Sequence, residues 1–237
     1  ITADGFAGTT VAWTGDSPLE VALEPAPLAE QVTVTAGRTP RPLGDTAASV
    51  VVLSRDDLDR TGALTLDGAL KAVPGFQLFR RTDSRAANPT AQGASLRGVA
   101  PSGASRAAVL VDGVPLTDPF GGWVYWSRVP RAAIDRVEVT RGGASSLYGT
   151  DALGGAVQVL TRPGRAEPWL ALDASVGSQG TAEASAAGGA GAGPWRVSLN
   201  GELFHTDGYT LVHDDERGAV DVEASSEHRT LGALVER

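Results

Sequence analysis

Apolar and polar residues alternate regularly in the last third of the chain. The run WLALDASVGS places Leu170, Leu172 and Val176 on one face of a strand and Asp173 on the opposite face. The same alternation continues in PWRVSLNGELFH and, more weakly, in TAEASAAG and HRTLGALVE. A period of two residues indicates β-strands with one apolar and one polar face. We therefore expect antiparallel strands here, joined by a short turn at GGAGAGP and a long polar loop at TDGYTLVHDDERG.

Strand and helix patterns are mixed in residues 46–165. The pattern predicts strands in SVVVLS, AAVLV, RVEVTRG and AVQVLT, with an Asp-Gly hairpin turn after AAVLV. Ser54 is placed to cap a helix over DDLDR, with Asp57 at the capping-box position. Thr65 is placed to cap a second helix, LDGALKAV, and a third short helix is expected at RAAID. This mixture predicts an α+β fold.

Two short alternating runs, TTVAW and LEVAL, lie within residues 1–25, and the proline-containing run EPAPLAE follows them. We interpret the first segment as the end of a β domain and the second as a linker, because proline cannot continue a strand ladder. In QVTVTAGR, Val32 and Val34 alternate with threonines, which predicts a strand without a hairpin partner. Such a strand is suited to pair with a sheet edge of another protein. The alternative is that it pairs within the chain.

Composition narrows the class of protein and of partner. Hydrophobic residues make up 42% of the chain and charged residues 20%, which is typical of a folded protein. The net charge of −8 arises entirely within residues 166–237, because residues 1–165 carry equal numbers of basic and acidic side chains. This balance disfavours nucleic acid as a partner. The chain has no Cys, so it has neither a disulfide nor a thiolate metal site.

The start of the chain has neither the basic residues nor the apolar core of a signal peptide, and the sequence has no Met. We therefore expect the natural N-terminus to lie upstream. No run of about 18 apolar residues occurs, so the sequence predicts no transmembrane helix. Membrane proteins built from alternating strands are not detected by this criterion.

The segment RGGASSLYGTDALGGAVQVLT is rich in glycine, which raises the question of a nucleotide site. A phosphate-binding loop needs glycines followed by Lys and Ser or Thr, and then a helix. Here no Lys follows the glycines, and the segment ends in a predicted strand. We therefore favour tight bends between two strands over nucleotide binding.

Four motifs occur in a recognisable order: VTVTAGR, SLRGV, VLVDGVPL and RVEVTRGGASSLYGTDALGGAVQVLTR. In this order and spacing they closely resemble the plug domain of TonB-dependent outer-membrane receptors, over residues 30–165. The strands after residue 168 look like the start of that family's barrel, which has about 22 strands. Residues 1–25 resemble, over a short stretch, the end of a carboxypeptidase-regulatory-like β-sandwich.

The resemblance implies a division of the chain. Residues 1–25 end the β-sandwich, 26–45 form a linker with the TonB box, 46–165 form the plug and 166–237 form the first strands of an incomplete barrel. Because so few strands cannot close such a barrel, we expect the chain to be a fragment. In this family the TonB box pairs as a strand with the periplasmic protein TonB. By position, the box comprises Glu30, Gln31, Val32, Thr33, Val34, Thr35 and Ala36.

The implied function is energised uptake of a scarce solute of the siderophore, cobalamin or glycan class, metal chelates included. The implied location is the Gram-negative outer membrane, with the plug facing the periplasm. The implied partners are TonB, the lipid bilayer and the small solute, with no cofactor, resident metal or enzymatic activity. The alternative is a plug-like periplasmic or surface module that binds a ligand without transporting it. Nucleotide binding at the glycines ranks third.

Two polar plug loops carry the candidate ligand contacts, which are Arg80, Arg81, Arg85, Trp123, Tyr125 and Trp126. We weigh these roles against two others, which we favour: the aromatic rings pack against the barrel wall, and the arginines pair with lumen carboxylates. Further plug–wall ion pairs are expected at Arg97, Arg106, Arg136 and Arg141. The histidines His205, His213 and His228 are expected to be ordinary loop residues.

A final group of residues is expected to shape the plug itself through tight turns and packing. The group consists of Arg97, Gly98, Asp112, Gly113, Arg141, Gly142, Tyr148, Gly149, Gly154 and Gly155.

Overall fold

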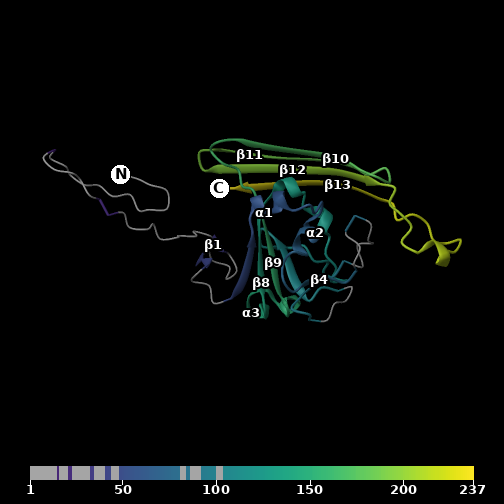
Figure 1. Ribbon diagram of the computed structural model, residues 1–237. Coiled ribbons are helices and arrows are strands. Elements are labelled where there is room, and N and C mark those ends of the chain that lie inside the picture. The colour runs from purple at the N-terminus through teal and green to yellow at the C-terminus, as the bar shows by residue number, and fades with distance from the viewer. Residues whose placement is uncertain are drawn as a thin grey trace.

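The computed structural model describes residues 15, 21–22, 33–34, 41–43, 48–80, 84–85, 92–99 and 104–237. The β-sandwich end expected in residues 1–25 and most of the linker lie outside the described residues. From residue 48 onwards the chain forms a plug unit, and a four-stranded sheet lies across one end of it (Figure 1). We call this four-stranded sheet the wall.

Within the described ranges, the plug unit is built on a mixed five-stranded sheet. Its strands are β3 (Ser49–Leu53), β6 (Ala107–Val111), β7 (Val114–Pro115), β8 (Ile134–Arg141) and β9 (Gly155–Thr161), in the order β3-β8-β9-β6-β7. Strands β6 and β9 run parallel, and the other pairs are antiparallel. A separate ladder joins β4 (Phe76–Leu78) and β5 (Ala94–Leu96). The α+β prediction is confirmed.

Both predicted helix caps are present. Ser54 Oγ accepts a hydrogen bond from the Asp57 backbone N–H, and the Asp57 carboxylate accepts one from the Ser54 backbone N–H. Thr65 Oγ1 accepts a hydrogen bond from the Gly68 backbone N–H. The short helix expected at RAAID is the 3-10 turn η4. The helical elements are α1 (Arg55–Arg60), α2 (Leu66–Leu70), η3 (Trp126–Arg128), η4 (Arg131–Ala133), α3 (Ser145–Tyr148), η5 (Thr150–Ala152) and η6 (Asp214–Glu216).

The main hydrophobic core lies between α1, α2 and one face of the mixed sheet. The helices contribute Leu58 and Leu70, and the strands contribute Val109, Val137 and Val157, all fully or almost fully buried. Burying a side chain of this size stabilises a fold by roughly 1.5–3 kcal/mol, so these contacts hold the helices on the sheet. A smaller cluster includes Ala108, Leu110, Ala144, Ala152 and Ala156, which pack near the glycine-rich segment.

The glycine-rich segment makes tight bends between β8 and β9, as we expected. Gly155 has a φ of +142°, and a Cβ atom there would collide with the carbonyl oxygen of Thr140. Gly142 has a φ of +115°, which residues with side chains rarely adopt. The segment contains only the four-residue helix α3 and ends in a strand. Its geometry therefore differs from the strand–glycine loop–helix arrangement of a phosphate-binding loop.

Each strand of the wall pairs in antiparallel fashion with the next one along the chain. The strands are β10 (Trp169–Val176), β11 (Ala182–Ala192), β12 (Trp195–Thr206) and β13 (Ser226–Glu236). Residues 177–181 and the long loop 207–225 join strands at one end of the wall, and the Gly193-Pro194 turn joins strands at the other. The turn expected at GGAGAGP was placed too early, because residues 188–192 continue β11. Glycine has a low propensity for strands, but the pairing of these residues with β12 overcomes it.

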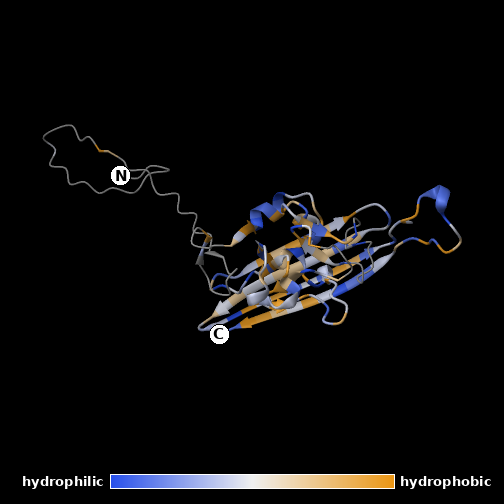
Figure 2. Ribbon diagram, turned by 90° about the horizontal axis from the view of Figure 1, so that it is seen from below, coloured by the Kyte–Doolittle hydropathy of each residue, from blue (hydrophilic) through white to orange (hydrophobic). Residues whose placement is uncertain are grey.

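The wall has one apolar and one polar face, as the alternation predicts. On the face directed away from the plug, Leu172 and Leu231 are 72% and 87% exposed. Glu183, Ser185 and Glu202 lie on the face directed toward the plug. Figure 2 shows hydrophobic stretches along the wall strands and a hydrophilic η6 turn in the long loop. None of the helices in the described ranges is long and apolar enough to cross a membrane.

The strand expected in QVTVTAGR is present in part and has a hairpin partner. Strand β1 (Thr33–Val34) pairs with β2 (Arg41–Pro42) over two residues. The expectation of an unpaired strand is therefore wrong. A ladder of two residues tolerates proline because so few backbone N–H groups take part in it. In Figure 1, β1 lies toward the end of the molecule where the chain ends, opposite the long loop 207–225.

Candidate functional site

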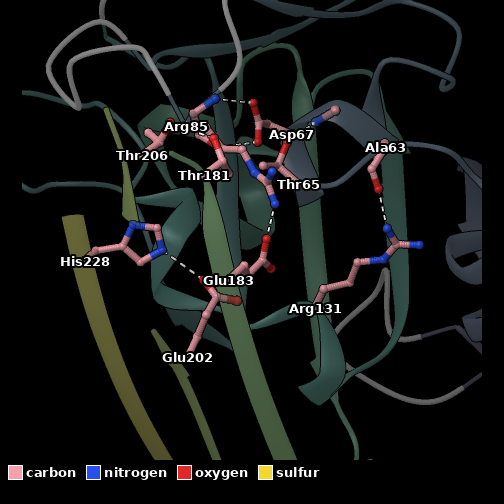
Figure 3. A network of polar contacts seen from close by, with 12 residues as sticks. Ala63, Thr65, Asp67, Arg85, Arg131, Thr181, Glu183, Glu202, Thr206 and His228 are labelled. Carbon is pink, nitrogen blue, oxygen red and sulfur yellow. Dashed lines mark hydrogen bonds and ion pairs between the residues drawn. The ribbon is translucent and has the colours of Figure 1, made fainter. Parts of the chain in front are cut away.

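The polar face of the wall meets a plug loop at a cluster of charged side chains (Figure 3). Arg85 forms an ion pair with Glu183 of β11, and the two side chains are 13% and 11% exposed. The Arg85 guanidinium also lies over the ring of Phe204 in β12, 5.0 Å from its centroid. Contact with a carboxylate and an aromatic face together gives a cation two favourable partners in one place.

A buried carboxylate on the plug side positions this loop. Asp67 lies in α2 and is fully buried. Its carboxylate accepts hydrogen bonds from the Ser84 backbone N–H at 3.0 Å and from Ser84 Oγ at 2.6 Å. A buried carboxylate needs such donors to compensate for its lost hydration. Asp67 therefore fixes the residue next to Arg85.

A second polar pair lies beside the first one. Nε2 of His228, in β13, is 2.9 Å from Oε1 of Glu202, in β12. The His228 ring also stacks on Phe204, with 4.7 Å between ring centroids. The expectation of ordinary loop residues is wrong for His205, which lies in β12, and for His228, because β13 starts at Ser226 and its alternation directs His228 toward the plug.

Two cavities adjoin this cluster between the plug and the wall. The smaller one has a volume of about 30 Å³, which is close to the share of one water molecule in liquid water. The larger one has a volume of about 280 Å³ and is lined mainly by polar residues of α1, η4, β10 and β11. Glu183 and Arg131 border both cavities. The Arg131 guanidinium donates to the carbonyl oxygens of Leu58 and Ala63, which ties η4 to the end of α1.

A different kind of contact joins η4 to the wall. Ala132 and Ala133 pack against Ala187 of β11, together with Trp169 and Ala171 of β10. Small side chains on both surfaces allow the two backbones to approach closely. This contact is apolar, in contrast to the cluster around Arg85.

The predicted ligand contacts separate into different environments. Arg80 is exposed, whereas Arg81 lies outside the described residues. Trp123 and Tyr125 are half-buried and meet edge to face at 6.4 Å, and the Arg128 guanidinium lies over the Tyr125 ring.

Trp126 is 3% exposed and meets Phe76 edge to face inside the plug core. Its burial gives it a packing role in the plug core, and it also borders the smaller cavity together with the wall residues Phe204 and His228. The sequence analysis overlooked Phe120, which is 98% exposed next to these aromatic residues.

The expected plug–wall ion pairs are wrong for two of the four arginines. Arg136 pairs with Glu138 at 3.0 Å in its own strand β8, and Arg141 donates to Ser49 Oγ at 2.8 Å in β3. Both contacts lie within the plug, because the plug sheet itself supplies nearer acceptors. Arg97 and Arg106 are exposed.

The Asp-Gly hairpin has the backbone expected of a type I′ turn, with φ of 47° at Asp112 and 83° at Gly113. Its carboxylate has a role that the sequence analysis did not identify. It accepts hydrogen bonds from the backbone N–H and the hydroxyl of Thr161, at 2.9 and 2.6 Å. The turn thereby binds the end of the last plug strand.

Other residues expected to shape the plug also lie in turns or close contacts. Gly98 and Gly149 have positive φ, a Cβ at Gly154 would lie 2.7 Å from the carbonyl oxygen of Leu96, and Tyr148 packs on the alanine cluster. No group of three or more His, Asp or Glu side chains among the described residues is placed to hold a metal ion.

Residues 42–156 match the family model of the TonB-dependent receptor plug domain. Two similar curated proteins are vitamin B12 transporters named BtuB. The one from Vibrio cholerae serotype O1 is 32% identical over 164 residues, which cover 69% of this chain and 26% of the relative. The one from Vibrio vulnificus is 30% identical over 190 residues, which cover 80% and 30%. The chain thus spans less than a third of the length of these relatives.

Similar solved structures include the siderophore receptor PirA from Acinetobacter baumannii, with a TM-score of 0.60 and 19% identity over 78% of this chain and 29% of that chain. The alcaligin receptor FauA from Bordetella pertussis gives a TM-score of 0.57 and 22% identity over 73% and 29%. At these identities the likeness shows a shared fold. The plug topology, the two-faced wall packed on it and the match of residues 42–156 together identify this chain as a member of the TonB-dependent receptor family.

Proposed function

We propose that this chain is the plug and the first barrel strands of a receptor that imports a scarce solute across the outer membrane with energy delivered by TonB. The two-sided wall carries the proposal. Its polar face packs on the plug, whereas its other face exposes leucines such as Leu172 and Leu231. An exposed apolar band of this kind is unfavourable in water and is solvated by the lipid of a bilayer.

The connections between wall strands support an orientation in the membrane. In outer-membrane barrels, short turns face the periplasm and long loops face outward. Here the two-residue turn at Gly193-Pro194 lies at one end of the wall and the loop 207–225 at the other. Strand β1 lies toward the short-turn end, where a periplasmic partner has access (Figure 1). We therefore propose that the plug faces the periplasm at this end.

We further propose that TonB binds residues 30–36 by adding a strand to β1. The ladder between β1 and β2 spans two residues, and each main-chain hydrogen bond contributes about 1 kcal/mol net. At the two described residues of this segment, Thr33 and Val34, TonB therefore has only a short ladder to displace.

Replacing Val34 with proline removes a backbone donor from the centre of this segment. We expect Val34→Pro to abolish capture of the full-length receptor by the periplasmic domain of TonB in a pull-down assay. Ala29→Pro, in the adjoining proline-containing linker, serves as the control and should leave capture unchanged. Normal capture by Val34→Pro would refute the assignment of the TonB box.

For the solute, we propose a cobalamin or a siderophore-type metal chelate, because relatives bear the names vitamin B12 transporter and siderophore receptor. A glycan is the third class. The half-buried Trp123 and Tyr125 are the proposed plug contacts. The test is uptake of radiolabelled cobalamin or ferric siderophores by cells that carry the full-length receptor, with and without functional TonB. Accumulation that requires TonB supports transport, whereas saturable binding without accumulation supports the ligand-binding module.

A further inference from the structure

Among the described residues, two of the surfaces through which the plug contacts the wall respond differently to separation. The first is the alanine contact of Ala132 and Ala133 with Ala187, whose separation exposes apolar surface and leaves no charge unpaired. The second is the cluster around Arg85, where separation leaves charged groups without partners. The second surface is therefore the one at which specific residues can control whether the plug stays on the wall.

The ionisable side chains of the cluster come from four segments of the structure. Arg85 comes from the plug loop, Glu183 from β11, Glu202 from β12 and His228 from β13. Because Glu183 and Glu202 lie close together on the polar face, their mutual repulsion favours cations between and beside them. Arg85 supplies such a cation at Glu183, His228 lies beside Glu202, and both side chains contact the ring of Phe204.

The Arg85–Glu183 pair is largely removed from water, which makes each partner dependent on the other. Exposed ion pairs contribute little because water replaces the lost partner. When one member of a buried pair is lost, the other remains as an uncompensated charge in a poorly hydrated place. A buried ion pair is therefore stable while both side chains are in contact, and it is strongly destabilised when either side chain moves away.

The plug side of the contact is also fixed. Asp67 in α2 accepts two hydrogen bonds from Ser84, the residue before Arg85. An unbroken series of polar contacts therefore runs from the buried end of α2, through Ser84 and Arg85, to Glu183 on the wall (Figure 3). Movement of α2 relative to the wall must break or stretch a member of this series.

We propose that the Arg85–Glu183 pair, seated on Phe204 beside the Glu202–His228 pair, is a latch that holds the plug on the wall and opens before the plug moves. Arg85 is a positioning residue in this scheme. The adjoining cavities of about 30 and 280 Å³ give water a place to solvate the separating charges. The proposal rests on the proposed transport function, but the latch can be measured without solute and without TonB.

Residues 1–237 contain no Cys, which allows a direct measurement once any Cys elsewhere in the full-length receptor is replaced by Ser. Ser185 lies on the polar face of β11, lines the larger cavity and is 7% exposed, so Ser185→Cys introduces a single shielded thiol of similar size. The rate of maleimide labelling of this thiol, in the full-length receptor in outer-membrane vesicles, reports how often the plug leaves the wall. Each variant below carries Ser185→Cys, and its folding is checked by the heat-dependent mobility shift of intact barrels.

We expect Arg85→Ala and Glu183→Gln to raise the labelling rate about tenfold or more, because either change removes the ion pair from this poorly hydrated contact. The exchanged pair, Arg85→Glu with Glu183→Arg, should return the rate toward that of the parent, which a merely structural loss of packing would not do. Arg229→Ala removes an exposed arginine that pairs with Glu227 on β13, and it is the matched control with an unchanged rate.

Parental labelling rates in both single variants would overturn the latch, and so would an exchanged pair as fast as Arg85→Ala. If Arg85→Ala fails to fold, Glu183→Gln and the exchanged pair decide the question, because Gln keeps the size of the side chain. A latch that behaves as expected in a receptor that accumulates no solute would refute the transport proposal alone. Solute uptake with no change in labelling would refute the latch alone.

Discussion

The capping box at the start of α1 shows how one side chain controls both helix stability and an ionisation. Ser54 donates to the Asp57 carboxylate through its hydroxyl and its backbone N–H. These hydrogen bonds, led by that of the hydroxyl, hold the pKa of Asp57 below its usual range. They favour the charged form because a carboxylate accepts hydrogen bonds more strongly than a neutral acid does.

Ser54→Ala removes the cap, and we expect α1 to lose about 1 kcal/mol of stability near neutral pH. Because the pKa of Asp57 is lower in the folded protein, its contribution is complete above about pH 4 and disappears as the pH falls through the folded-state value. The variant should therefore show a smaller loss of α1 stability on acidification. Hydrogen exchange of the α1 amides as a function of pH measures both effects. Ser54→Thr, which keeps the hydroxyl, should behave like the parent, and identical pH profiles for Ser54→Ala and the parent would contradict the argument.

At the scale of secondary-structure elements, the sequence predicted those features that depend on interactions between residues close together in the chain. The caps at Ser54 and Thr65, the Asp-Gly turn and the alternation of the wall strands depend on residues within a few positions of one another, so they could be predicted. The length of β11 could not be predicted in this way, because its glycines are held in a strand by pairing with β12.

The partners of long-range contacts were also hidden from the sequence. Arg85 meets Glu183 across 98 positions of the chain, and Asp112 meets Thr161 across 49. A pattern of nearby residues contains no information on such pairs. For the same reason the sequence did not reveal that Arg136 and Arg141 find their partners within the plug. For the candidate site, the sequence thus indicated which types of residue take part but did not indicate which residues pair with one another.

Strand β11 offers a test of how closely the plug and the wall approach. Ala187 is 2% exposed and packs on Ala132 and Ala133, whereas its neighbour Ala186 is exposed on the opposite face. Ala187→Leu should destabilise the plug–wall contact by about 1–3 kcal/mol, because a well-packed surface has no room for the added atoms. Protease sensitivity of the plug in the full-length receptor reports this change. Ala186→Leu adds the same atoms to the apolar face and should leave sensitivity unchanged, so equal effects of the two substitutions would contradict the packing that we describe.

At the scale of the whole molecule, the membrane assignment depends on the different environments of the two faces of the wall. The plug lies on one side of the wall (Figure 1), and the exposed leucines lie on the other. If lipid covers the second side, an arginine at Leu172 should cost about 2–4 kcal/mol when it lies near the middle of the bilayer. We therefore expect Leu172→Arg to reduce the folded receptor recovered from outer membranes.

The control places the same side chain on the other face of the same strand. Ser175 lines the polar cavity between plug and wall, where an arginine finds water and the carboxylates Asp173 and Glu183. Ser175→Arg should therefore assemble nearly as well as the parent. In a water-soluble protein Leu172→Arg should assemble as well as Ser175→Arg, because an arginine is well tolerated on an exposed surface. The ratio of folded receptor between these two variants thus tests the membrane assignment independently of any solute and of TonB.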